Sequence, residues 1–96
     1  MITRATLAQH RDAILELARR HGATNVRVIG SVARDEAGSD SDLDLLVRFE
    51  PERTLFDHGA LIMDLQDLLR AKVDVISEKG IRPRWRESIL REATPL

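Results

Sequence analysis

The stretch that decides the fold covers residues 42–49 and reads Asp-Leu-Asp-Leu-Leu-Val-Arg-Phe. Apolar residues recur at every second position, a period that predicts a β-strand. Four of them share one face, which must be the core face: Leu43, Leu45, Val47 and Phe49. Asp42 and Asp44 then share the opposite face, and Pro51 closes the strand. The strand is therefore expected to carry two carboxylates on the open side of a sheet.

Shorter stretches on either side are expected to join this strand. Upstream, residues 25–29 are β-branched and end at Gly30-Ser31, after which residues 31–36 have room for a helical turn. Downstream, residues 72–76 predict a third strand, in which the valines face one way and Asp74 faces the other. A third carboxylate thus lies on the same side of the sheet.

Amphipathic stretches predict helices around the sheet. Residues 6–21 carry an apolar stripe, with Thr6 and Gln9 as an expected capping pair and Gly22 as the left-handed stop. Residues 57–70 repeat leucines at helical spacing.

A last helix is expected to start near Pro83 and to bury Trp85 and Ile89. The elements then follow the order αβ(α)βαβα. This order indicates an α/β (α+β) fold, a small mixed β-sheet with flanking helices.

Length and composition narrow the class of protein. The 96 residues suit one domain, residues 1–96, and 43% hydrophobic residues suffice for one core. The absence of cysteine excludes disulfides and thiolate zinc sites, and no apolar run is long enough to cross a membrane, so a cytoplasmic protein is expected. Fifteen basic and 16 acidic residues give a net charge of −1, which makes nucleic acid an unfavoured main partner.

The three aspartates are the candidate catalytic and metal-binding residues: Asp42, Asp44 and Asp74. Neighbouring strands lie about 4.8 Å apart, so carboxylates there either keep a proton or share a cation, and hard oxygen ligands suit Mg²⁺ or Mn²⁺. Two such ions serve in-line nucleotidyl transfer. Gly30 and Ser31 complement the aspartates because a glycine lets phosphate approach the backbone and a helix start offers free N–H groups.

Simpler interpretations apply to several of these residues. An Asp-x-Asp taken alone is more often turn chemistry than a metal site, and Asp40 is a rival ligand that more readily caps the loop. Arg34 is balanced between an exposed arginine and a phosphate contact. The histidines lack metal-ligand spacing. The C-terminal arginines are favoured as a solvated or partner-facing surface: Arg82, Arg84, Arg86 and Arg91.

Together these motifs resemble the DNA polymerase β-type nucleotidyltransferases, specifically the minimal (MNT) branch. The resemblance rests on Gly-Ser-Val-Ala-Arg at 30–34, Ser-Asp-Leu-Asp-Leu-Leu-Val at 41–47, and Asp74 in a later strand. Asp35 departs from the family, which usually has a glycine there.

The resemblance implies a polymerase β-like palm. Gly30 and Ser31 would bind the phosphates of ATP, with Arg34 as a further candidate. Asp42 and Asp44 would ligate two Mg²⁺ ions, and Asp74 would join the metal site and help to deprotonate the acceptor. Members of the branch are commonly antitoxins that transfer AMP to a tyrosine of a HEPN ribonuclease toxin.

Two other classes of function stay open at this point, a binding-only antitoxin and a nucleotide-sensing module without turnover. The sequence contains no tyrosine, so a tyrosine acceptor must lie in another protein. The basic C-terminal helix, with Arg84, Arg86 and Arg91, is the candidate for steering that partner.

Overall fold

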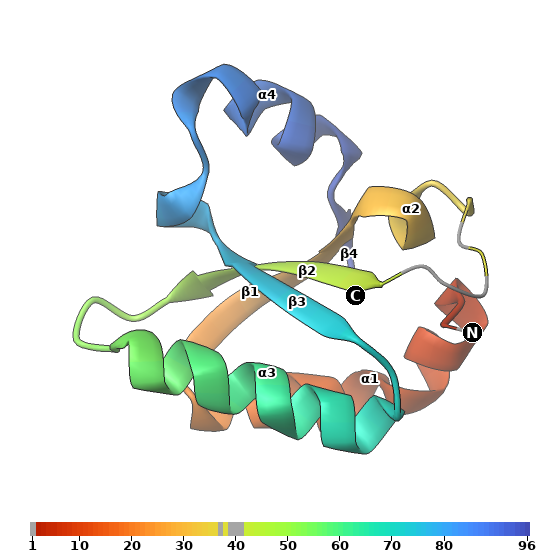
Figure 1. Ribbon diagram of the computed structural model, residues 1–96, viewed down its shortest axis with the longest axis horizontal. Helices are drawn as coiled ribbons and strands as arrows, with labels where there is room; N and C mark the ends of the chain where they lie inside the picture. Colours follow the sequence, from red (N-terminus) through yellow and green to blue (C-terminus); the bar gives the residue numbers. More distant parts are fainter. Residues whose placement is uncertain (1, 37, 39–41) are drawn as a thin grey trace.

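The computed structural model describes residues 2–36, 38 and 42–96. Helices and strands alternate along the chain in nearly the predicted order (Figure 1). The elements are α1 Arg4–Arg20, β1 Ala23–Ile29, α2 Gly30–Ala33, β2 Leu43–Phe49, α3 Leu55–Leu69, β3 Val73–Ser77, the 3₁₀ turn η1 Glu78–Gly80, α4 Pro83–Glu92 and β4 Thr94–Pro95.

The four strands form a mixed sheet in the order β3-β2-β1-β4. β1 pairs antiparallel with β2 and β4, whereas β2 pairs parallel with β3. A parallel pair needs a crossover, and α3 supplies it. The mixed sheet is as predicted. The sequence analysis missed β4, because two residues, one of them a proline, carry no periodic signal.

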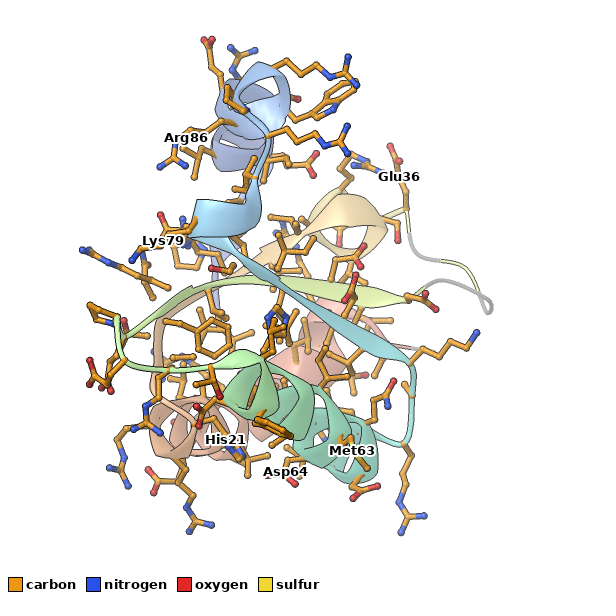
Figure 2. All side chains as sticks on the ribbon, turned by 60° about the vertical axis from the view of Figure 1, so that its left-hand side comes forward. His21, Glu36, Met63, Asp64, Lys79 and Arg86 are labelled. Atoms are coloured by element: carbon orange, nitrogen blue, oxygen red, sulfur yellow. The ribbon has the colours of Figure 1, made fainter. Side chains whose placement is uncertain are left out.

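Helices α1 and α3 lie side by side across one face of the sheet (Figure 1). Their apolar stripes meet the predicted core face of β2, where Leu43 and Leu45 are fully buried. Between the helices, His21 Nε2 lies 2.6 Å from Asp64 Oδ2 (Figure 2). The alternation along residues 43–49 therefore identified the core face correctly.

The predicted start of the first helix is wrong. Thr3, in extended conformation, is the N-cap, and its side chain accepts the N–H of Thr6. Thr6 is thus inside the first turn and does not pair with Gln9 as a capping box. The predicted stop is confirmed, since Gly22 follows the helix with a φ of 76°.

Helix α2 lies at the end of β1 and buries its apolar residues in the main core, while the opposite face of the sheet carries α4 (Figure 1). A small cluster of Ile29, Leu46 and Ile81 lies there, and Ile89 packs against it, half-buried. The predicted burial of Trp85 is wrong, because its side chain is 53% exposed and the Arg84 guanidinium lies 5.2 Å from its ring centroid. The cluster contacts α4 through Ile89, and none of the residues of this helix is fully buried. Within the described ranges, no helix is long and apolar enough to span a bilayer.

Candidate active site

The sheet register places two of the predicted aspartates opposite each other. Asp44 on β2 is the direct partner of Asp74 on β3, and Ile29 at the end of β1 is its partner on the other side. Asp42, exposed, comes immediately before β2. Because Ile29 leads straight into Gly30, the carboxylates and the predicted phosphate-binding residues lie together at one end of the adjacent strands β1, β2 and β3.

Two features of position 30 favour glycine. Its φ is 77°, in the left-handed region, and an added Cβ would lie 2.6 Å from Asp44 Oδ2. Ser31 follows in the first turn of α2, half-buried. The glycine therefore lets the backbone of α2 approach the Asp44 carboxylate closely.

Asp35 also has a positive φ, of 57°, just after α2. In this left-handed region glycine is the least strained residue. An aspartate tolerates the left-handed region better than most residues, and its carboxylate lies 3.6 Å from the Arg4 guanidinium. The departure from the family pattern is therefore compatible with the observed backbone.

The three aspartates are a mutually repulsive set. Burial, followed by the negative charges of Asp74 and Asp42, raises the pKa of Asp44, while nearby Arg34 opposes the shift. Among the described residues, no three acidic or histidine side chains converge tightly enough to hold a metal ion as they stand. The donor set still fits a hard divalent cation, because all three ligands are carboxylates and a cation would relieve their repulsion.

Glu92, at the end of α4, is a member of the site that sequence reasoning missed. Its Oε1 accepts the Gly30 N–H at 3.0 Å, and its Oε2 accepts from Arg34 Nη1 at 3.0 Å. Arg34 also donates to Glu36. Glu92 lies 62 residues beyond Gly30, and no local pattern in the sequence connects the two. The rival ligand Asp40 lies outside the described residues.

An open groove of about 700 Å³ is lined by β3 from Asp74 to Ser77 and by Lys79 and Gly80 of η1. The first turn of α3 forms its other side, with Leu55 and His58 in the wall. Leu55 and its neighbour Phe56 are 85% and 90% exposed, the largest fractions among the exposed large hydrophobic residues of the described chain. The carboxylate Asp74 thus opens onto a groove of mixed polar and apolar lining, with exposed apolar side chains beside it.

Comparison with known proteins identifies the fold and family. The family model described as a nucleotidyltransferase domain matches residues 7–96. Protein adenylyltransferase MntA of Thermococcus cleftensis is 36% identical over 77 residues, which cover 80% of this chain and 78% of MntA. A Methanocaldococcus jannaschii protein, MJ0435, provisionally named a protein adenylyltransferase, is 35% identical over 83% of this chain and 86% of its own.

The chain belongs to the nucleotidyltransferase domain family.

Solved structures agree with this assignment. A protein provisionally identified as a minimal nucleotidyltransferase is 57% identical to this nucleotidyltransferase and superposes with a TM-score of 0.90, covering 99% of this chain and 97% of the other. A toxin-antitoxin structure with AMP-PNP shares the fold, with a TM-score of 0.75 at 16% identity over 88% of this chain and 69% of the other. The predicted fold class and the resemblance to the minimal nucleotidyltransferases are confirmed.

Proposed function

We propose that this nucleotidyltransferase is a Mg²⁺-dependent protein adenylyltransferase that transfers AMP from ATP to a tyrosine of a HEPN-type toxin in the cytoplasm. The observation that carries the proposal is the register of Asp44 against Asp74, with Gly30 held against the Asp44 carboxylate. The names of the relatives, protein adenylyltransferases, support the same reaction. The AMP-PNP in the toxin-antitoxin neighbour supports ATP as the substrate.

Asp42 and Asp44 would hold two Mg²⁺ ions, with Asp74 joining them. Bound there, the ions would neutralise charge on the phosphates and lower the pKa of the attacking hydroxyl. Gly30 and Ser31 would orient the triphosphate through a backbone N–H and a hydroxyl, and Arg34 would add a positive charge.

The proposed transfer is an in-line displacement at the α-phosphorus of ATP. The acceptor oxygen forms a bond to the α-phosphorus, the bond from that phosphorus to the bridging oxygen breaks, and pyrophosphate leaves with the electron pair. The proton of the acceptor hydroxyl goes to the Asp74 carboxylate, which lies exposed at the start of the groove.

The groove supports an acceptor brought by a partner protein. The sequence has no tyrosine, so a tyrosine acceptor must enter from outside. Leu55 and Phe56 offer apolar surface at the first turn of α3, beside the groove that leads to Asp74. The arginines of α4 would steer an acidic partner, because Arg84, Arg86 and Arg91 are all exposed.

The test incubates the protein with Mg²⁺, α-labelled ATP and its co-encoded partner and maps the label by mass spectrometry. We expect label on a partner tyrosine, and we expect Asp44→Asn to abolish it. Asp12→Asn is the matched control, because the Asp12 side chain is 98% exposed on α1. Tight binding and neutralisation of the partner without label would instead establish a binding-only antitoxin.

A further inference from the structure

Glu92 contacts two groups that the proposed function assigns to the nucleotide. One carboxylate oxygen accepts the Gly30 N–H, and the other pairs with Arg34, both at 3.0 Å. The Glu92 side chain is 30% exposed and reaches these groups from the last residue of α4, on the far side of the strands from α1 and α3. A side-chain carboxylate thus stands among the donors expected to receive a phosphate.

Glu92 and a triphosphate are unfavourable neighbours at this place. A single N–H makes one strong hydrogen bond, so the Gly30 amide serves either the carboxylate or a phosphate oxygen. The Glu92 carboxylate is itself negatively charged and already contacts both groups that a phosphate would use. Adding a polyanion beside it would bring like charges together.

We propose that Glu92 is a built-in competitor of the nucleotide, so that ATP binds only when Glu92 leaves Gly30 and Arg34 and α4 loosens from the sheet. This inference rests on the proposed function, because it takes Gly30 and Arg34 to be phosphate-binding groups. It adds a regulatory step, in which the position of α4 depends on whether nucleotide is bound.

The way α4 is attached fits such a step. The helix has no buried residue of its own. Ile89 and Ala93 pack against a small apolar cluster, Arg86 donates to the Glu78 carbonyl, and Glu92 supplies the contacts to Gly30 and Arg34. An element without buried residues is typical of those that move on ligand binding, although the chain is held to β1 again from Thr94 onward.

The first test compares the affinity of Mg²⁺ with a non-hydrolysable ATP analogue, by calorimetry, in wild type, Glu92→Gln and Glu92→Ala. Removing a competing conformation raises apparent affinity, and we expect tightening of about three- to tenfold, larger for alanine. Glu87→Gln is the matched control, because Glu87 lies on the same helix, 88% exposed, and pairs with Arg91. Unchanged or weaker binding by variants that melt like wild type would overturn the proposal and make Glu92 a positioning residue.

The second test uses Trp85 as a reporter of α4. The sequence has one tryptophan and no tyrosine, so the intrinsic fluorescence comes from this helix. We expect the analogue to change acrylamide quenching of Trp85 in wild type, and nucleotide-free Glu92→Ala to resemble the bound state already. A Trp85 signal that responds to neither change would contradict the coupling to α4.

The two proposals fail in different ways. If the Glu92 variants bind the analogue more tightly but no partner is labelled, the competitor role stands and protein adenylylation falls. If wild type labels its partner and the Glu92 variants bind the analogue more weakly, the competitor role falls alone. If neither wild type nor any variant binds the analogue, both proposals fall.

Discussion

At the scale of single residues, the site combines like-charged carboxylates with a close approach of the backbone to one of them. Asp44 is a half-buried carboxylate beside two others, and Gly30 has a left-handed backbone pressed against it. The carboxylate cluster opposes folding because like charges repel, whereas Gly30 adopts its positive φ without strain. Such local conflicts mark functional sites, because selection for chemistry overrides selection for stability there.

The close approach of Gly30 to Asp44 predicts the effect of a single methyl group. In Gly30→Ala, the new Cβ would displace the Asp44 carboxylate, in addition to the strain of a positive φ. We expect partner labelling to fall by about a hundredfold or more, since misplacing a reacting group by 1 Å has an effect of this order. Gly59→Ala, where an added Cβ also meets nothing within 4 Å and which does not line the groove, is the control and should keep full activity.

The raised pKa of Asp44 predicts how stability depends on pH. The folded protein holds this proton more tightly than the unfolded chain, so its free energy of unfolding, as far as Asp44 contributes, falls as pH rises from the ordinary value of 3.8 through the raised pKa. In metal-free buffer, Asp44→Asn should therefore become progressively more stable relative to wild type as the pH rises above the ordinary value of 3.8.

Denaturant titrations at several pH values measure this difference. Asp12→Asn should show no such trend, because Asp12 is remote from the cluster and exposed. Added Mg²⁺ should reverse the order at neutral pH, since the cation stabilises only the protein that keeps the Asp44 carboxylate. Parallel curves for wild type and Asp44→Asn would contradict the repulsion.

At the scale of elements, sequence periodicity predicted the strands and helices with a regular apolar pattern and did not predict contacts between residues distant along the chain. The alternation along residues 43–49 gave β2 and its core face, and the leucine spacing gave α3, because burial of one face forces those periods. The aspartate pairing was expected from the pattern, while its register came from the structure. Trp85 and Glu92 could not be placed from sequence, because α4 is positioned by contacts distant along the chain rather than by an apolar stripe.

Helix α3 also protects the edge strand β3. Its Gln66 side chain accepts the Val73 N–H, and its His58 ring bonds the Val75 carbonyl. These contacts occupy part of the free edge of the sheet, where unpaired backbone groups invite aggregation. The same helix that connects the parallel pair therefore shields its open side.

One residue of α3 is not optimal for a helix. Gly59 lies inside the helix, and an added Cβ meets nothing within 4 Å. Gly59→Ala should therefore stabilise the protein by about 0.5–1 kcal/mol, because alanine loses less backbone entropy on folding. Thermal or denaturant unfolding measures the gain. Gly22→Ala, at a φ of 76°, should change stability in the opposite direction, and a gain there would contradict the backbone argument.

At the scale of the whole molecule, the surfaces proposed for the nucleotide and for the acceptor are separate. Gly30, Arg34 and Glu92 lie toward α2 and α4, whereas the groove runs from Asp74 along β3 beside the first turn of α3. Under the proposed function, the partner would complete the acceptor side of the site by docking at this open groove. Mutations on the groove side should then weaken binding of the acceptor protein and leave the affinity for nucleotide unchanged.

The double variant Leu55→Ser, Phe56→Ser tests this separation. Both side chains are almost fully exposed, so the fold should lose little, while a docked partner would lose its apolar contact. We expect the KM for the partner in the labelling assay to rise about tenfold or more, since about 1.4 kcal/mol corresponds to a factor of ten and central interface residues often exceed it. The affinity for Mg²⁺ with the ATP analogue should stay at the wild-type value.

Met63→Ser is the matched control, because Met63 is 66% exposed further along the same helix and is not part of the groove (Figure 2). If Met63→Ser raised the KM equally, the contact would be a diffuse property of α3. If the double variant weakened nucleotide binding instead, the groove would belong to ATP and the acceptor would have to approach from the side of α4.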